Sequence, residues 1–464
     1  MSLQNRVPLT ATDLHALFGA EAIVPPYYAS VGIATDTRTM EPGTLFVALR
    51  GERFDAHDRI YDAMVRGAAG IVIEERWLDT WNATLGKEFP SFARVVVPDT
   101  LVALGALASF HRRRFSIPVI AVAGANGKTT TKDMIAHVLS ATYPTLKTHS
   151  NNNNRVGAPL TLMQLTARTG AAVIEIGTNE PGEIEALSAI VAPTHALITN
   201  IGEEHLEKLI DLDGVEKEET ALFRWAVRSN AAMIVNNDDE RLRYHASHAQ
   251  AWSFATETDA EVRATVTFDA RLHPHLHIDV RGVKGEAILL ATGHAAALNA
   301  VAAIATCVAV GIPVSDALER CAAFVPDASH GYARMVVENG AACVILNDCY
   351  NANPASMRMA LKTLRDHACR GRRIAVLGDM RELGAAEARA HAEIVEEARR
   401  SCDLLIVAGT AMTKACGGQS GKISVFETTD ACVSAIRSLV HEGDVVLVKA
   451  SRGMAFENVV AAVR

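Results

Sequence analysis

The sequence predicts an α/β protein of three domains, and three observations support this. The chain has 464 residues, which suggests about three domains because a domain commonly holds about 150 residues. Short apolar runs alternate with helical patterns, as they do in parallel sheets that helices cover on both faces. Hydrophobic residues make up 49% of the chain, which is enough for several packed cores.

Residues 1–100 are predicted to form a small mixed α/β N-terminal domain. Two apolar runs flanked by glycine, residues 43–51 and 67–75, have the pattern of buried strands. Asp99 then precedes a helical pattern, which the sequence Ser116-Ile117-Pro118 ends. The basic run 111–114 near the end of this helix is expected to face solvent.

Residues 101–325 are predicted to form a central P-loop-type parallel-sheet domain. The stretch "VIAVAGANGKTTT" (119–131) joins an apolar strand to a glycine loop and to the start of a helix. Apolar runs at 171–177, 195–202 and 231–237 predict further strands, and residues 296–311 predict an apolar helix.

Residues 326–464 repeat this organisation in a smaller, C-terminal Rossmann-like doubly wound domain. Strands are expected at residues 342–348, 372–380, 402–409 and 443–451, with helical patterns between them.

The glycine loop has the chemistry of a phosphate-binding site, although it is shorter than the common G-x-x-x-x-G-K-[ST] form. Backbone N–H groups at a helix N-terminus and the helix dipole favour a bound anion. Lys128 would neutralise β- and γ-phosphate charge, the Thr129 hydroxyl would ligate Mg²⁺, and Thr130 would cap the helix or hold phosphate oxygens. The alternative is an ordinary glycine turn between a strand and a helix.

Polar residues follow several of the predicted strands. Glu175 ends one apolar strand, where an unpaired carboxylate would be costly, and His205 follows another. The segments "LNDCYNANP" (346–354) and "KASRGMAFE" (449–457) add polar side chains after two strands of the third domain. Such residues in two domains suggest one cleft between the domains.

Composition and charge narrow the classes of function. The net charge of −8 gives no reason to expect nucleic-acid binding. The first residues have no apolar core of signal-peptide type, and no apolar stretch is long enough for a membrane span. The eight cysteines contain no C-x-x-C pair, so we expect reduced thiols in a cytoplasmic protein and no zinc site.

These motifs together resemble the Mur ligase family over nearly the whole chain. "GANGKTTT" is similar to the shortened phosphate loop of that family, and "YNANPASM" with "LGDMRELG" is the most specific pair of motifs. "DTRTMEPGTLFVALRGERFDAHD" (36–58) resembles the uridine-nucleotide segment, and "HSNNNNRVGAPLTLM" (149–163) resembles the segment that reaches the sugar-peptide substrate. The motifs are most similar to those of the member that joins D-alanyl-D-alanine to UDP-N-acetylmuramoyl tripeptide.

The resemblance implies an ATP-dependent ligase that forms a C–N bond through an acyl phosphate in peptidoglycan precursor synthesis. ATP phosphorylates the terminal carboxylate of the tripeptide, and the amine of D-alanyl-D-alanine then displaces phosphate. Lys128 and two Mg²⁺ ions would offset the repulsion between the carboxylate and the γ-phosphate. We expect a monomer that binds these two substrates; whether the tripeptide ends in lysine or diaminopimelate stays open.

The resemblance also assigns roles to residues of this chain. The ATP site would contain Gly124, Asn126, Gly127, Lys128, Thr129, Thr130, Asn299, Arg334 and Asp348. The residues expected at the metal ions are Thr129, Glu175, His205 and Glu219. Substrate contacts would come from Thr37, Arg38, Asp55 and His57 (uridine), Asn153 and Asn154 (sugar-peptide), and Asn351, Asn353, Lys449, Ser451 and Arg452 (incoming amine).

One departure from the family pattern concerns the metal site. Most members carry a carbamoylated lysine where this chain has Glu219, whose carboxylate offers two oxygens like a carbamate. Lys217 is the alternative, because residues two apart on a helix point in nearly opposite directions and cannot both face the metal. A third interpretation makes residues 216–219 a charged, solvated helix face. Ala295 also stands where the family usually has histidine, so only Asn299 is kept from that motif.

Three other functions remain open from the sequence. One is a different ligase of the same superfamily, of the folylpolyglutamate or cyanophycin type, which the uridine-like segment argues against. Another is a P-loop ATPase or kinase, for which a longer loop would be expected. The last is a catalytically silent binding protein, if Glu219 has disrupted the metal site.

Overall fold

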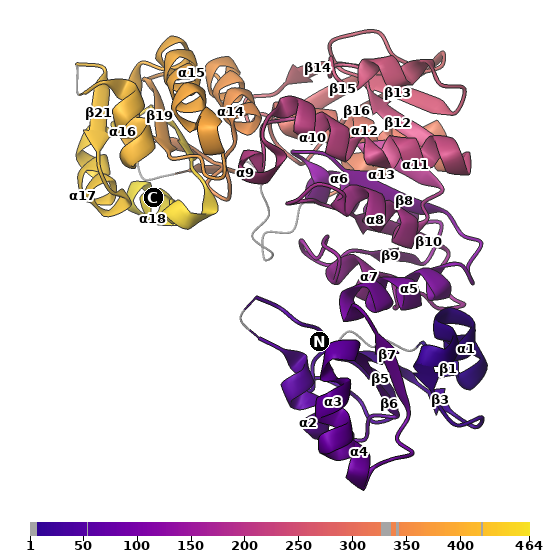
Figure 1. The fold of residues 1–464 in the computed structure, drawn as a ribbon. Coiled ribbons are helices and arrows are strands. Elements are labelled where there is room, and N and C mark those ends of the chain that lie inside the picture. Colours follow the sequence, from indigo (N-terminus) through magenta and orange to yellow (C-terminus); the bar gives the residue numbers. More distant parts are fainter. Residues whose placement is uncertain (1–6, 53, 326–335, 340–342, 419–420) are drawn as a thin grey trace.

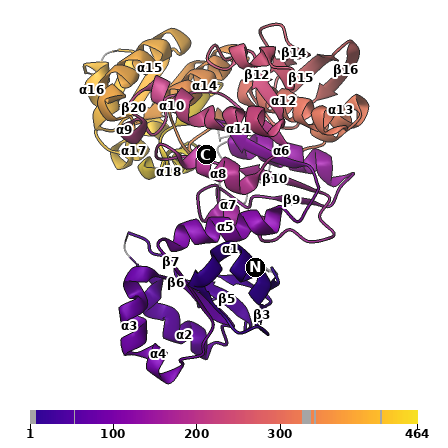
Figure 2. The same cartoon turned by 45° about the vertical axis from the view of Figure 1, so that its right-hand side comes forward.

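The computed structural model describes residues 7–52, 54–325, 336–339, 343–418 and 421–464. Three α/β units follow one another along the chain, each built around its own sheet (Figure 1). The N-terminal unit lies below the central unit, and the C-terminal unit lies beside the central unit (Figures 1 and 2). This arrangement confirms the predicted α/β class. Among the described residues, no helix has the length and apolar character needed to span a membrane.

The N-terminal unit contains a mostly parallel sheet in the order β2-β7-β6-β5-β4. The two strands predicted from glycine-flanked apolar runs are β5 and β6, and every residue of both is buried. The elements are β1 (Leu9–Thr10), α1 (Ala11–Phe18), β2 (Ala22–Ile23), β3 (Ala29–Ser30), β4 (Gly32–Ala34), β5 (Thr44–Val47), α2 (Ile60–Val65), β6 (Gly70–Glu74), α3 (Leu78–Ala83), α4 (Leu85–Glu88) and β7 (Arg94–Val97).

Helix α5 (Thr100–Arg112) joins the first two units. Asp99 caps it by accepting hydrogen bonds from the backbone N–H groups of Leu101 (2.7 Å) and Val102 (3.0 Å). One continuous apolar core extends from the N-terminal sheet across α5 into the central unit. The expectation of a solvated basic run is wrong for His111, which is buried with Nε2 2.9 Å from the Leu165 carbonyl oxygen. It is also wrong for Arg112, which is buried and donates to the carbonyl groups of Val191 and Ala192 at the end of α8. Burying this guanidinium satisfies carbonyl groups that the helix end leaves without partners.

The central sheet has the order β16-β15-β14-β13-β12-β11-β8-β10-β9. The four strands predicted in this region are present as β8, β10, β11 and β12, whereas β9 and β13 were not predicted. The strands from β14 to β9 in this order are all parallel. The antiparallel extension β14-β15-β16 was not predicted, because β15 alternates buried and more exposed residues instead of forming a continuous apolar run. The strands are β8 (Val119–Ala123), β9 (Thr145–Lys147), β10 (Ala171–Glu175), β11 (His195–Ile198), β12 (Ala232–Asn236), β13 (Ala251–Ala255), β14 (Val262–Phe268), β15 (Pro274–Val280) and β16 (Val283–Ile288).

Helices cover both faces of this sheet. One apolar core forms beneath α6, α12 and α13, and the core shared with the N-terminal unit lies beneath α5, α7, α8 and α11. The helices are α6 (Lys128–Ser140), α7 (Gly157–Leu162), α8 (Glu183–Val191), α9 (Leu206–Leu209), α10 (Leu212–Glu219), α11 (Ala221–Ser229), α12 (His294–Val310) and α13 (Val314–Ala322).

The C-terminal sheet has the order β17-β18-β22-β19-β20-β21 and is parallel except for β17. The four predicted strands are confirmed as β18, β19, β20 and β22, while the edge strands β17 and β21 were missed. The elements are β17 (Val336–Asn339), β18 (Val344–Asn347), α14 (Pro354–Asp366), β19 (Arg373–Gly378), α15 (Glu387–Ser401), β20 (Leu404–Ala408), α16 (Thr410–Cys416), β21 (Ile423–Phe426), α17 (Thr429–Leu439), β22 (Val445–Lys449) and α18 (Glu457–Val463).

The C-terminal unit contacts the central unit through both apolar and polar side chains. Leu206 and Leu209 of α9 belong to the same apolar core as Met380 and Leu383 of the C-terminal unit. Polar contacts connect His294 with Asp366 (2.8 Å), Lys362 with Glu257 (2.7 Å) and Arg389 with Glu203 (2.9 Å). These contacts place the ends of the strands β8 and β11 opposite those of β18 and β22.

Candidate active site

The glycine loop between β8 and α6 depends on two left-handed backbone positions. Gly124 has φ +109° and Gly127 has φ +81°. A Cβ atom on Gly124 would lie 2.4 Å from Thr199 Oγ1, and one on Gly127 would lie 2.4 Å from Asn299 Oδ1. Both positions therefore require glycine, and the resulting turn directs the first turn of α6, which has no side-chain N-cap, at the cleft.

We expect Gly127→Ala to weaken nucleotide binding. The added methyl group would strain a left-handed position and displace Asn299, so KM for ATP should rise roughly tenfold or more. Gly282→Ala is the matched control, because Gly282 has a similar φ of +90° but nothing within 4 Å of the added atom. Equal KM values for ATP in the two variants would contradict the role of the close approach to Asn299.

Lys128 is surrounded by carboxylates. Its ammonium donates to the Gly124 carbonyl and lies 3.6 Å from Glu204 Oε2. Burial by itself would lower the pKa of Lys128, but Glu204, Glu219 and Glu175 outweigh burial and raise it. Among the described residues, Glu175 Oε2, Glu204 Oε1 and Glu219 Oε1 are buried without hydrogen-bond partners.

Glu219 lies directly beneath the loop. Its side chain is fully buried at the end of α10, and Oε2 accepts a 2.8 Å hydrogen bond from Gly124 N–H. Burial and the neighbouring Glu204 raise the pKa of Glu219 to about 8, against the opposing effect of Lys128. Lys217 is exposed, and Glu218 caps the start of α8 through Gly182 and Ile184. Residues 216–219 are therefore not a uniformly solvated face, and Glu219 is the one directed at the loop.

Glu175 connects the loop helix to the segment predicted to reach the sugar-peptide substrate. Its Oε1 accepts hydrogen bonds from Thr129 Oγ1 (3.1 Å) and Asn153 Nδ2 (2.9 Å). Its Oε2 lies 3.6 Å from the ammonium of Lys132, another fully buried group of α6. The polar cluster thus offsets the cost of burying this carboxylate at a strand end.

The donor set beneath the loop suits Mg²⁺. Hydroxyl and carboxylate oxygens are its preferred ligands, and it usually keeps waters and substrate phosphates in its remaining positions. Oxygens of this kind are Thr129 Oγ1, Glu175 Oε2 and Glu219 Oε1. The two carboxylate oxygens accept no hydrogen bond from the described residues, although Glu175 Oε2 lies 3.6 Å from the Lys132 ammonium. Within the described ranges, no three His, Cys, Asp or Glu side chains converge as a complete metal cage. His205 instead pairs through Nδ1 with Glu382 of the C-terminal unit, at 2.7 Å.

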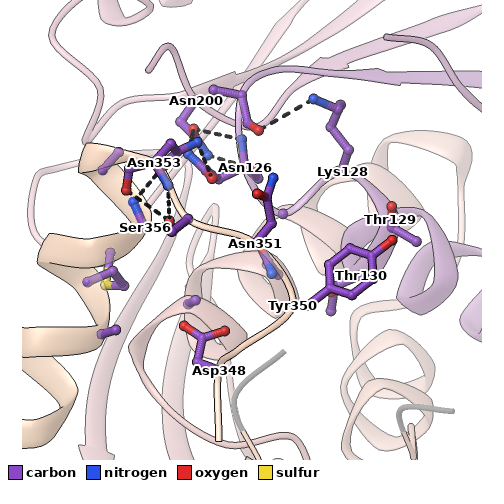
Figure 3. Close-up of a pocket in the computed structure, with 18 of the residues that line it drawn as sticks. Asn126, Lys128, Thr129, Thr130, Asn200, Asp348, Tyr350, Asn351, Asn353 and Ser356 are labelled. Carbon is purple, nitrogen blue, oxygen red and sulfur yellow. Dashed lines mark hydrogen bonds between the residues drawn. The ribbon is translucent and has the colours of Figure 1, made fainter. Parts of the chain in front are cut away.

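A cleft of about 1280 Å³ opens between the central and C-terminal units at this loop. Figure 3 shows Asn126 of the loop between Asn200 and Asn353. Asn353 Nδ2 donates to Asn126 Oδ1 (2.9 Å), and Asn200 Nδ2 donates to the Asn126 carbonyl (2.9 Å). The predicted site residues that line the cleft are Asn126, Gly127, Lys128, Thr129, Thr130, Asn153, Asn154, His205, Asn299, Asp348, Asn351, Asn353, Lys449, Ser451 and Arg452.

On the C-terminal side, Asp348 and Lys449 form a 2.8 Å ion pair at the ends of β18 and β22. Burial raises the pKa of Asp348 and Lys449 partly opposes this. Lys449 also donates to the Asn351 carbonyl (2.8 Å), so it fixes the loop that follows β18. Ser451 accepts from Arg381 N–H (3.0 Å), whereas the Arg452 side chain is mostly exposed beside Glu457.

The residues predicted to bind uridine lie in the N-terminal unit and do not line this cleft. Arg38 is 84% exposed and pairs with Asp36, while Thr37 is buried. His57 is buried, with Nδ1 bonded to Asp55 (2.6 Å) and Nε2 accepting from Glu74 N–H (3.0 Å), so neither ring nitrogen is left for a ligand. Burial would raise the pKa of Asp55, but Arg76 and His57 lower it to about 2. Arg334 lies outside the described residues.

Sequence reasoning missed three residues of the site. Glu204 immediately precedes His205 and belongs to no recognised motif, but it lies 3.6 Å from Lys128. Lys132 follows Lys128 by one helical turn, a spacing that places both on the same side of α6. Asn200 follows β11 and bonds to Asn126, a contact that only the paired strand ends reveal.

Comparisons with known proteins agree with this arrangement. Residues 122–307 match the Mur ligase middle domain, and residues 333–452 match the Mur ligase glutamate ligase domain. The chain is 31% identical to the UDP-N-acetylmuramoyl-tripeptide–D-alanyl-D-alanine ligase of Bacillus subtilis, with 94% of each chain aligned. A crystal structure of MurF from Acinetobacter baumannii superposes with a TM-score of 0.86 at 29% identity, covering 99% of both chains. MurF ligase from Thermotoga maritima in complex with ADP gives 0.81 at 25% identity, covering 93% of this chain and 96% of the other.

These similarities cover 94% to 99% of the chain and so extend over all three units. With sequence identity above 30% sustained along nearly its whole length, this chain belongs to the Mur ligase family.

Proposed function

We propose that this protein joins D-alanyl-D-alanine to UDP-N-acetylmuramoyl tripeptide at the expense of ATP, in the synthesis of peptidoglycan precursors. The observation that carries the proposal is the placement of Lys128 and Glu204 at one wall of a cleft whose other wall is the C-terminal unit. Glu175 and Glu219 are buried beneath the loop that carries Lys128. The names of the related proteins support the same pair of substrates.

The reaction brings two anionic groups into contact, the tripeptide carboxylate and the γ-phosphate of ATP. The tripeptide carboxylate attacks the γ-phosphorus of ATP to give an acyl phosphate and ADP, and the dipeptide amine then attacks the acyl carbon and releases phosphate. Lys128 and the N–H groups at the start of α6 stabilise the phosphoryl oxygens. Thr129, Glu175 and Glu219 would hold Mg²⁺, which would supply further positive charge to the phosphoryl oxygens.

The remaining roles rest on the resemblance to the Mur ligase family. We assign Asn299 and Asp348 to ATP, Asn153 and Asn154 to the sugar-peptide, and Asn351, Asn353, Lys449, Ser451 and Arg452 to the region of the incoming dipeptide. The N-terminal unit, residues 1–100, would hold the uridine nucleotide near Thr37, Arg38 and Asp55, with His57 positioning Asp55. Residues 101–325 would bind ATP, and residues 326–464 would bind the dipeptide and part of ATP.

Two further properties belong to the proposal. The eight cysteines are free, and burial raises the pKa of thiols such as Cys321 and Cys432, to about 12 and about 11. Free, unreactive thiols suit a reducing compartment, so we place the protein in the cytoplasm. We expect it to act as a monomer, which sedimentation of the purified protein would test.

The test is ADP release from ATP with UDP-N-acetylmuramoyl tripeptide, in the presence and absence of D-alanyl-D-alanine. Release should require both the tripeptide and the dipeptide, and the product should contain the new amide bond by mass spectrometry. Tripeptides that end in lysine and in diaminopimelate are compared in the same assay. Turnover without any amine acceptor would support a P-loop ATPase instead, and turnover with folate and glutamate would support the other ligase class.

A further inference from the structure

Lys132 is a fully buried lysine that the reaction described above does not use. It lies on α6 one turn after Lys128, and its side chain has 0% exposure. An ammonium removed from water is costly unless anions or carbonyl oxygens surround it. The groups that contact the Lys132 ammonium therefore indicate which parts of the site this side chain positions.

Two of its contacts link different parts of the site. The ammonium lies 3.6 Å from Glu175 Oε2, whereas Thr129 and Asn153 bond the other oxygen, Oε1. It also donates a 3.1 Å hydrogen bond to the Ser150 carbonyl. A third neighbour, Asp133 Oδ1 at 3.6 Å, is itself paired with Lys147 at 2.6 Å.

Ser150 begins the turn that leads into the asparagine segment, and its backbone is strained. Its φ is +55°, a conformation that non-glycine residues keep only when their surroundings enforce it. Three residues later, Asn153 Nδ2 donates to Glu175 Oε1 and packs so closely over Gly177 that a Cβ there would lie 2.8 Å from it. The segment is thus attached at Ser150 through Lys132 and at Asn153 through Glu175.

We propose that Lys132 is a positioning residue for the UDP-linked substrate. It holds Glu175 and residues 150–154 in one geometry, so that the asparagines lining the cleft direct the substrate carboxylate toward the phosphate loop. Its complete burial means that it acts through these groups and does not touch the substrate. The inference rests on the proposed function for its kinetic test and is independent of it for its structural test.

The kinetic test compares Lys132→Met and Lys132→Arg with Lys147→Met. Lys147 shares the Asp133 partner, but its side chain is 48% exposed and lies outside the site, so its loss should leave both KM values unchanged. Lys132→Met should raise KM for the UDP-tripeptide roughly tenfold or more while changing KM for ATP much less. A purely structural defect would lower the active fraction, and hence kcat, without this difference between substrates. Unchanged KM for the tripeptide, or equal increases for both substrates, would overturn the proposal.

The structural test is amide hydrogen exchange over residues 148–157 in the substrate-free protein. Exchange should accelerate in Lys132→Met but not in Lys147→Met, because only the former removes the hydrogen bond to Ser150. Equal protection in both variants would overturn the proposal, even if the wild-type protein proved inactive with the tripeptide. Should Lys132→Met fail to fold, Lys132→Arg decides: its charge is kept, but a planar guanidinium does not reproduce the ammonium contacts. Lys132→Arg should show a smaller acceleration of exchange and a smaller increase in KM for the UDP-tripeptide than Lys132→Met. Exchange rates and KM values equal to those of the wild type would overturn the inference.

Discussion

Replacing Lys128 with alanine should reduce ligase activity by about 10³-fold or more, because it removes the positive charge nearest the developing charge on the γ-phosphate. Lys128 reaches this position because the short loop turns back at Gly127 and its ammonium is oriented by the Gly124 carbonyl and Glu204. The loss should appear in kcat with the tripeptide and the dipeptide both saturating, measured by ADP release.

The variant also leaves Glu175, Glu204 and Glu219 without their shared cation, so its stability must be measured separately. Lys128→Arg is the matched control: it keeps the charge but replaces a compact ammonium with a planar fork. We expect Lys128→Arg to fold normally and to recover little activity. Near-wild-type turnover by Lys128→Ala, in protein that remains folded by circular dichroism, would refute the assignment of the loop.

Glu219→Ala should lower activity by about 100-fold, through weaker Mg²⁺ binding and loss of the acceptor for Gly124 N–H. Glu219→Gln separates these effects, because the amide oxygen can still accept the hydrogen bond but carries no charge. Both variants should need more Mg²⁺ for half-maximal activity, with the larger change in Glu219→Ala. Lys217→Ala is the control, since Lys217 is exposed on the same helix. Full activity in Glu219→Ala would remove this residue from the metal site.

The raised pKa of Glu219 also predicts how the stability of the protein depends on pH when no nucleotide or metal is bound. Burial raises its pKa from 4.5 to about 8, so the folded state holds a proton that the unfolded state has already released. The contribution of this proton to the free energy of unfolding is complete below about pH 4.5 and is lost as the pH rises toward 8. In EDTA, the melting temperature should therefore fall across this interval, and Glu219→Gln should fall less. Mg²⁺ favours the ionised carboxylate and should reduce the same dependence in the wild type.

The parts of the fold that could be predicted from sequence are those that bury both faces. The strands β8, β10, β11 and β12 are continuous apolar runs, and the helix after the loop follows from its glycines and lysine. The edge extension β14–β16 was missed because one face of β15 is more exposed, so polar residues such as His277 interrupt the apolar signal. Burial on both faces made the predicted strands recognisable, although β7 and β13 are also largely buried and were missed.

For the site, sequence indicated the residues at strand ends but not their partners. Lys128, Glu175 and Glu219 were identified from motifs, and their roles at ATP and metal remain predictions. The hydrogen bond from Asn353 to Asn126 joins residues 227 positions apart, and its existence depends on how the C-terminal unit is oriented. Glu204 belongs to no recognised motif, and its place in the site became evident only from the 3.6 Å distance between its Oε2 and the Lys128 ammonium.

The short helix α9 has a mechanical consequence. Leu206 and Leu209 are embedded in the C-terminal unit, although the chain that carries them belongs to the central one. Glu204, whose carboxylate lies 3.6 Å from the Lys128 ammonium, is only two residues before Leu206. A rotation of the C-terminal unit relative to the central unit would therefore displace the Glu204 carboxylate. The electrostatic field at the triphosphate of bound ATP would then vary with the angle between the two units.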